Sequence, residues 1–422
     1  MPSAASPSHP KSSSASGSTQ CSTEVRDGVL WFCIPAHGHT NPTIEVVREL
    51  TRRGHEVRYY SFEEFRERIE DAGAQLVACD SFLPPIDEKV EKRLRRVSTT
   101  EMSVQSFRTV ANLDPVVSED VASWRPDVVV TDSACFWGKL AAAKHGLPWV
   151  CSTTTFAFNQ QSSKYMSHSA SEMADIILGL PRLNREIRKL RPLGYHVKSA
   201  LDIVSNKPED NTIVYTSRTF QPCSETFDEG HYRFVGPSVR DVAPKEKVGR
   251  PLVYASLGTV INDRPGFYRT LIDALRDADA DLLVSCGRAF DPAQLGMLPD
   301  NVRVEQHVDQ MEVLSRASLF VTHCGMNSAS EGMWMGVPEL LFPLTGEQRA
   351  VAKRVAEVGA GTMLKEEAAR NGAALRHAVL AALEDERLIE GSTRMRDDLR
   401  SCVGPAGAAD FIEQVARRHV GA

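Results

Sequence analysis

Two short apolar runs flank a glycine turn and a helix at residues 319–342, and this order restricts the fold more than any other stretch of the chain. Residues 319–321 and 340–342 are apolar without alternation, as strands covered on both faces of a parallel sheet are. Between the runs, Asn327 and Ser328 are predicted to cap the helix, and Glu331 lies three positions beyond Ser328. The pattern predicts an α/β fold built on a parallel sheet.

The start of this helix is expected to bind an anion. It directs free N–H groups and the positive end of its dipole into the crevice at the carboxyl ends of the strands. His323 and Ser328 add side-chain donors, and Gly325 lets the backbone approach a ligand closely. Glu331, one turn into the helix, can accept from a pair of sugar hydroxyl groups. The ligand that fits is a nucleoside diphosphate with a ribose.

Two residues after the second strand extend the pattern. Glu347 and Gln348 offer an acceptor and an amide to further hydroxyl groups, which a second sugar on the other side of the diphosphate would supply. Taken singly, each of these residues is better explained as a helix cap, a buried histidine or a surface pair. Their order along residues 319–348 favours a binding site.

Length, charge and cysteine spacing limit the remaining choices. A chain of 422 residues is long enough for two domains, and its net charge of -6 suggests neither nucleic acid nor an anionic membrane as a partner. The 9 cysteines show no C-x-x-C or zinc spacing, which is typical of buried thiols in a reducing compartment. Residues 1–27, rich in Ser, Ala and Pro, lack the apolar core of a secretory signal. We expect a disordered tail and a cytoplasmic protein.

A second set of polar residues follows two predicted strands near the start of the chain. His37 and His39 lie in the loop P-A-H-G-H-T-N-P after a strand at residues 29–34, and no G-x-G-x-x-G follows it to hold a nicotinamide or flavin. Asp132 follows a strand at residues 128–130. It could cap the next helix, or accept from one imidazole nitrogen and stabilise the protonated ring.

Residues 319–348 resemble the donor-sugar box of the UDP-dependent, inverting glycosyltransferases with the GT-B fold, whose relatives include plant secondary-product and bacterial macrolide glycosyltransferases. The similarity extends over nearly the whole chain from about Gly28. It implies two Rossmann-like, doubly wound parallel-sheet domains that face each other across a cleft. The implied order is a tail (1–27), an acceptor-binding domain (28–238), a linker (239–250), a UDP-sugar-binding domain (251–404) and a C-terminal helix packing back on the first domain (405–422).

The resemblance also implies roles for individual residues. His39 becomes the general base and Asp132 its partner, with His37 as the alternative base. The diphosphate contacts are His323, Gly325, Asn327 and Ser328, the ribose contact is Glu331, and the contacts to the transferred sugar are Glu347 and Gln348. Gln348 is the residue that the family associates with glucose donors.

Further donor contacts are implied earlier in the second domain. Ser256 and Thr259 border a glycine-hydroxyl turn that suits a phosphate oxygen. Val308 and Gln310 are expected near the uracil ring of the nucleotide. His307 stands where the family has a stacking tryptophan, and because imidazole stacks more weakly than indole, the choice between UDP and TDP stays open.

The acceptor pocket is harder to place. The resemblance assigns it to residues 156–198, which show no compact α/β rhythm, and to nearby loops, although the same apolar side chains could be plain core. The candidates are Phe82, Phe107, Phe156, Phe158 and Met173. The charged residues 88–96 lack the interleaved aromatic side chains of a nucleic-acid site and predict a solvated helix.

The expected activity is transfer of a hexose, with glucose as first choice, to a hydroxyl of a small and largely apolar acceptor such as a polyketide, a phenol or another secondary metabolite. The configuration would invert. No metal and no cofactor are expected, since the helix start, His323 and Ser328 would stabilise the leaving diphosphate. UDP-glucose and the acceptor are the expected partners of a monomer or weak dimer, without nucleic acid or integral membrane contact. The alternatives are a non-catalytic nucleotide-sugar sensor or complex subunit and, among enzymes, a hydrolase or epimerase.

Overall fold

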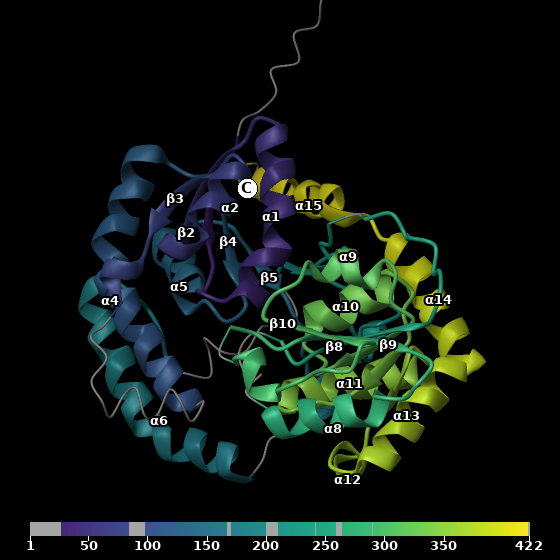
Figure 1. Ribbon diagram of the computed structural model, residues 1–422. Helices are drawn as coiled ribbons and strands as arrows, with labels where there is room; N and C mark the ends of the chain where they lie inside the picture. The colour runs from purple at the N-terminus through teal and green to yellow at the C-terminus, as the bar shows by residue number, and fades with distance from the viewer. Residues whose placement is uncertain are drawn as a thin grey trace, which may run out of the picture.

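The computed structural model describes residues 27–83, 98–166, 170–199, 210–240, 242–258, 264–288 and 290–420. The predicted tail, apart from its last residue, the charged residues 88–96 and Thr259 lie outside these ranges. Two parallel sheets with helices on both faces form two domains that lie side by side (Figure 1). Among the described residues, no helix combines the length and apolarity needed to cross a membrane.

The first sheet has seven strands in the order β3-β2-β1-β4-β5-β6-β7, and every strand pair is parallel. The strand β1 lies in the interior of the sheet, between β2 and β4, because a run of fully buried apolar residues can be covered by helices on both faces. The strands are β1 (Gly28–Phe32), β2 (Glu56–Ser61), β3 (Gln75–Ala78), β4 (Val128–Asp132), β5 (Trp149–Thr153), β6 (Thr212–Val214) and β7 (Tyr232–Phe234). The helices are α1 (His37–Arg52), α2 (Arg66–Asp71), α4 (Thr99–Trp124), α5 (Phe136–His145) and α6 (Ala170–Leu190).

The second sheet has the strand order β10-β9-β8-β11-β12-β13, the doubly wound order of dinucleotide-binding folds. Its strands are β8 (Leu252–Ser256), β9 (Asp281–Ser285), β10 (Val302–Glu305), β11 (Leu319–Thr322), β12 (Glu339–Leu341) and β13 (Gly361–Met363). The helices are α8 (Pro265–Leu275), α9 (Gln310–Leu314), α10 (Met326–Trp334), α11 (Gly346–Glu357), α12 (Glu366–Ala369), α13 (Gly372–Glu384), α14 (Glu386–Arg400) and α15 (Gly404–Val420). The predicted fold class is confirmed.

The long helices α4 and α6 were not predicted, and α6 occupies much of the stretch that showed no α/β rhythm. They pack mainly against each other, and Arg182 of α6 holds the buried carboxylate of Glu101 of α4 at 2.6 Å. Pro115 and Pro181 lie inside the helices, and proline normally predicts a helix end. Gly179 allows the close approach, since a Cβ there would lie 2.1 Å from the hydroxyl oxygen of Thr100.

Two further details concern the second domain. The helical stretch at residues 366–384 is divided into α12 and α13. The side chain of Asn371 accepts from the amide of Ala374 at 3.0 Å and thereby starts a new helix. The helix α14 had no counterpart in the predicted elements.

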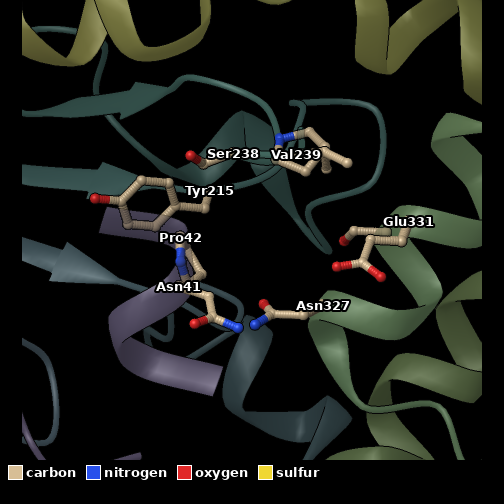
Figure 2. Close-up of a pocket in the computed structure, with 9 residues that line it drawn as sticks. Asn41, Pro42, Tyr215, Ser238, Val239, Asn327 and Glu331 are labelled. Atoms are coloured by element: carbon tan, nitrogen blue, oxygen red, sulfur yellow. The ribbon is translucent and has the colours of Figure 1, made fainter. Parts of the chain in front are cut away.

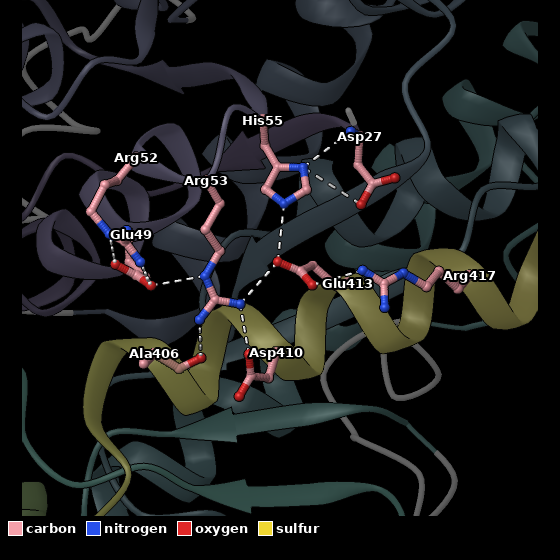
Figure 3. Close-up of polar contacts among 9 residues, drawn as sticks. All are labelled: Asp27, Glu49, Arg52, Arg53, His55, Ala406, Asp410, Glu413 and Arg417. Atoms are coloured by element: carbon pink, nitrogen blue, oxygen red, sulfur yellow. Dashed lines mark hydrogen bonds and ion pairs between the residues drawn. The ribbon is translucent and has the colours of Figure 1, made fainter. Parts of the chain in front are cut away.

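The helix α15 returns from the second domain and lies along α1 of the first (Figure 1). Its apolar residues Phe411, Ile412, Val415 and Ala416 belong to the same core as the strand β1. A polar clasp borders this contact (Figure 3). Arg53 reaches Asp410 at 2.6 Å and Glu413 at 2.9 Å, and His55 Nε2 lies 3.0 Å from Glu413.

A buried carboxyl group lies on β12, below α10. Glu339 is fully buried, and neither of its oxygens has a hydrogen-bond partner among the described residues. Gly332 faces it, because a Cβ at that position would lie 2.5 Å from Glu339 Oε1. Burial raises the pKa of Glu339 well above its ordinary value, which favours the protonated carboxyl group in the folded protein.

We expect Glu339→Gln to stabilise the protein at pH 8 relative to the native chain, and much less at pH 5. Because the pKa of Glu339 is higher in the folded than in the unfolded protein, its protonated form contributes fully to stability below the unfolded-state pKa of about 4.5. This contribution is lost as the pH rises towards the folded-state pKa. The difference in unfolding free energy grows by at most about 1.4 kcal/mol per pH unit in this window. Urea unfolding at both pH values measures it.

The matched control is Glu367→Gln, which removes an exposed carboxyl group of the same domain. Its pH dependence should follow that of the native protein. Equal pH dependence for the native chain and Glu339→Gln would contradict a protonated Glu339.

Candidate active site

The first domain brings His39 and Asp132 together at the carboxyl edge of its sheet. His39 lies in the first turn of α1, directly after β1, and Asp132 ends the neighbouring strand β4. His39 Nδ1 lies 2.7 Å from Asp132 Oδ2 and 3.2 Å from the hydroxyl of Thr154. Asp132 does not cap α5, which starts after Cys135. Its other oxygen accepts from the amide of Ala134 at 2.8 Å.

The pair gives His39 the properties of a base. Burial lowers the pKa of His39, but the charge and hydrogen bond of Asp132 raise it more, with a further contribution from Glu347, so the net shift is upward. A carboxylate only accepts hydrogen bonds, so Nδ1 carries the proton that it donates to Asp132. The Nε2 atom of the neutral ring is then an acceptor, and the side chain is 27% exposed, which lets a substrate reach it.

His37 is separate from this pair. It is the first residue of α1, is exposed, and its ring meets the ring of Phe65 edge-on with 5.1 Å between centroids. Of the two loop histidines, His39 is therefore the one beside a carboxylate.

In the second domain, His323 fits between two glycine turns. A Cβ at Gly258, where φ is +81°, would lie 2.5 Å from His323 Nε2, and one at Gly325 would lie 2.7 Å from it. His323 Nδ1 is buried and has no hydrogen-bond partner among the described residues. Burial lowers the pKa of His323 to about 4, and the backbone of Ser256 opposes this shift only in part. The imidazole is neutral at pH 7 and can donate one hydrogen bond to a ligand.

The helix α10 starts earlier than predicted. Its N-cap is Gly325, with φ -61° and ψ 139°, so Asn327 and Ser328 lie inside the first turn and do not cap it. The prediction missed this because glycine at the cap is required by the neighbouring imidazole, a contact that the local sequence does not reveal. The Asn327 side chain donates to the carbonyl of Gly38 at 3.1 Å, and this bond joins α10 to the first turn of α1.

Glu331 lies one turn further along α10 and is held by Gln310. Gln310 Nε2 donates to Glu331 Oε2 at 2.6 Å and to the hydroxyl of Ser328 at 3.3 Å. Burial raises the pKa of Glu331, and the hydrogen bond from Gln310 opposes the shift. His307 is exposed and Val308 is half-buried, both just before α9.

Gln348 is partly committed to the start of α11. Its Oε1 accepts from the amides of Leu344 at 2.8 Å and Thr345 at 3.1 Å, and the Thr345 hydroxyl accepts from the amide of Gln348. This reciprocal capping box has the sequence signature T-x-x-Q, which could have revealed it. The carboxylate of Glu347 is exposed and contributes to the raised pKa of His39. A charged group of the second domain therefore acts on a titratable group of the first at this edge.

A small pocket lies between the domains, beside the candidate donor residues (Figure 2). One wall is the start of α1, a second is Tyr215 with residues 237–239, and the third is α10. Asn327 and Glu331 come from α10 and face this space (Figure 2). The candidate donor residues therefore border the first domain.

The acceptor candidates are scattered. Phe107 and Phe156 are each 1% exposed. Phe107 stacks on Phe136 in the core of the first domain, and Phe156 packs against Phe220 in a cluster that reaches α10, α11 and α14. Neither side chain is exposed enough to line an open acceptor pocket. Phe82 and Phe158 are half-buried, and Met173 is exposed on α6.

Among the described residues, no group of three or more His, Cys, Asp or Glu side chains is placed to hold a metal ion. Sequence reasoning also missed Thr154 beside His39, because a threonine after a strand carries no distinctive signal.

Comparison with known proteins gives consistent matches over this arrangement. Residues 269–415 match the family described as erythromycin biosynthesis protein CIII-like, C-terminal domain. An NDP-glycosyltransferase of Bacillus licheniformis is 32% identical over 392 residues, which cover 90% of this chain and 96% of that protein. The demethyllactenocin mycarosyltransferase of Streptomyces fradiae is 33% identical over 404 residues, which cover 91% of this chain and 86% of that protein.

Two solved structures have the same architecture. The structure of a glycotransferase of kitacinnamycin has a TM-score of 0.77 at 29% identity, covering 92% of this chain and 99% of that one. The structure of the calicheamicin glycosyltransferase has a TM-score of 0.70 at 29% identity, covering 93% of this chain and 99% of that one.

We expect Asp132→Asn to lower the pKa of His39 below the ordinary histidine value of 6.5. The substitution removes the charge that raises this pKa and leaves the burial that lowers it. A pH titration of the His39 ring signals by NMR, assigned with a His39→Gln spectrum, measures the change. Asp300→Asn, at an exposed turn, is the control that should leave the titration unchanged. An unaltered midpoint in Asp132→Asn would show that the carboxylate does not set the basicity of His39.

Proposed function

Because this chain belongs to the GT-B glycosyltransferases, in the group of macrolide and NDP-glycosyltransferases, we propose that it transfers a hexose from UDP-glucose to a hydroxyl of a small apolar secondary metabolite. The family that the donor box predicted is confirmed. The nucleotide, the sugar, the stereochemistry and the base are the proposed part. The observation that carries the proposed base is the 2.7 Å contact between His39 and Asp132. UDP and glucose are proposed from the resemblance of the donor box.

In the proposed reaction, His39 Nε2 removes the proton from the acceptor hydroxyl. The oxygen attacks the anomeric carbon from the face opposite the diphosphate, so a new C–O bond forms while the bond to the phosphate oxygen breaks. The configuration inverts, and the diphosphate leaves with the electron pair. Asp132 stabilises the imidazolium that forms, as an aspartate does in hydrolase triads.

The leaving diphosphate would be held by the second domain. The first-turn amides of α10, the neutral imidazole of His323 and the hydroxyl of Ser328 all follow the end of β11 and would donate to the diphosphate. Donors fixed before the reaction stabilise the developing charge without reorganising, and each is worth about 10²-fold or more in rate. We therefore propose that the reaction requires no metal and no cofactor.

The remaining donor contacts follow the order of the sequence. Glu331 would accept from the ribose, Ser256 would contact a phosphate oxygen, and Glu347 with the amide nitrogen of Gln348 would contact the hexose. Val308 and Gln310 would lie near the uracil ring of the nucleotide. Thr259 lies outside the described residues and stays a prediction, as does a cytoplasmic location.

The test is a mass-spectrometric transfer assay with UDP-glucose, EDTA and a broad panel of phenols and alcohols. A product heavier by one hexose is expected, and NMR of the anomeric proton would show the inverted configuration. TDP-glucose in parallel reactions tests the nucleotide. Saturable UDP binding without product over the whole panel would favour a nucleotide-sugar sensor.

We expect His39→Ala to lower turnover by roughly 10²- to 10⁴-fold, the usual contribution of a general base. Binding of UDP, measured by calorimetry, should remain, since the donor residues belong to the other domain. His37→Ala is the matched control, because it removes the exposed loop histidine and should turn over like the native enzyme. Turnover near the native rate in His39→Ala would exclude it as the base.

A further inference from the structure

A buried tyrosine in the second sheet is linked by hydrogen bonds to the donor residues. Tyr254 lies in the middle of β8, is 1% exposed, and its ring stacks on Phe320 of β11 with centroids 5.0 Å apart and planes 8° apart. Its hydroxyl donates to Gln310 Oε1 at 3.0 Å. The nitrogen of the same amide donates to Glu331 and Ser328. A chain of hydrogen bonds thus runs from the sheet to the start of α10.

The direction of each bond in this chain is determined by chemistry. The Glu331 carboxylate has no proton to donate when ionised, so the Gln310 nitrogen must face it. The amide oxygen then points to the other side, where it needs a donor. The Tyr254 hydroxyl supplies that donor, and burial raises its pKa, so it keeps its proton throughout the physiological range. Without this hydroxyl, the Gln310 amide would lose the contact that fixes its orientation.

The geometry also determines how Glu331 can bind a ligand. Gln310 holds the Oε2 atom at 2.6 Å, and Oε1 is the less restrained oxygen of a side chain that lies beside the pocket between the domains. A carboxylate fixed in this way presents one oxygen in a defined direction. It does not have to be ordered when a sugar hydroxyl arrives, which lowers the entropic cost of binding.

We propose that Tyr254 is a positioning residue for nucleotide recognition: it orients Gln310, which holds the Glu331 carboxylate ready to accept from the ribose hydroxyl groups. This inference rests on the proposed function, because it needs a donor with a ribose. It adds a residue that touches neither the donor nor the acceptor. The effect of Tyr254 should appear in ribose recognition and not in the chemical step.

The experiment is a calorimetric measurement of UDP and 2′,3′-dideoxy-UDP binding to the native protein, Tyr254→Phe, Gln310→Leu and the double variant. Tyr254→Phe keeps the stacked ring and removes only the hydroxyl. We expect it to weaken UDP binding about five-fold, the contribution of one hydrogen bond, and to leave dideoxy-UDP binding unchanged. Gln310→Leu should lose at least as much, and the double variant should lose no more than Gln310→Leu alone.

Kinetics with UDP-glucose give a second readout. Tyr254→Phe should raise the KM for the donor by the same factor, while kcat and the KM for the acceptor stay within about two-fold of the native values. Tyr195→Phe is the control, because Tyr195 is a buried tyrosine of the first domain whose hydroxyl donates to Asp114 at 2.7 Å. It should change neither nucleotide affinity nor donor KM.

The outcomes separate this inference from the function on which it rests. Equal losses for UDP and dideoxy-UDP in Tyr254→Phe would show a general structural role and overturn the inference. Unchanged UDP affinity in Tyr254→Phe would also overturn it, with the proposed donor left standing. No UDP binding by the native protein would overturn the proposed donor, and the inference with it.

Discussion

Parallel strands place all their carboxyl ends along one edge of a sheet, and both halves of the candidate site depend on this constraint. In the first domain, the ends of β1 and β4 hold His39 and Asp132 within hydrogen-bonding distance, although the two residues are far apart in sequence. In the second domain, the ends of β8 and β11 bring Ser256 and Gly258 next to His323. The two edges meet where Asn327 of α10 donates to Gly38.

Two histidines at this meeting point show how position sets chemistry. Both are largely buried, and burial alone would make each a weaker base. His39 has a carboxylate beside it, which reverses the shift, and the ring becomes a better proton acceptor. His323 lies beside two glycine turns and the Ser256 backbone, and burial lowers its pKa, so the ring is neutral. The pKa of histidine is therefore shifted in opposite directions in the two domains.

The features predicted from sequence are those that local pattern determines. The apolar runs of β1, β4, β8 and β11 identify buried strands, and strand direction places His39 and Asp132 level if β1 and β4 are neighbours. The resemblance, not the pattern alone, favours their pairing over a helix cap at Asp132. The failures arise where distant contacts decide. Phe156 is buried because Phe220 covers it. At Gly325, which caps α10, the deciding contact is local in sequence, but it depends on the orientation of the His323 ring, which the sequence does not reveal. The α4 and α6 pair was missed since each helix finds its apolar partner in the other, although β4, α5 and β5 lie between them in sequence and each helix contains an internal proline.

The position of α15 bears on how the protein is made. The core of the first domain contains Phe411, Ile412 and Val415, which a ribosome adds only after the entire second domain. During synthesis, the surface of the first domain that α15 covers therefore stays exposed until α15 has been made. The second domain can already fold by then. The domain that is translated first is completed last. The clasp of Arg53 and His55 with Glu413 joins the start of the first domain to the last helix of the described chain.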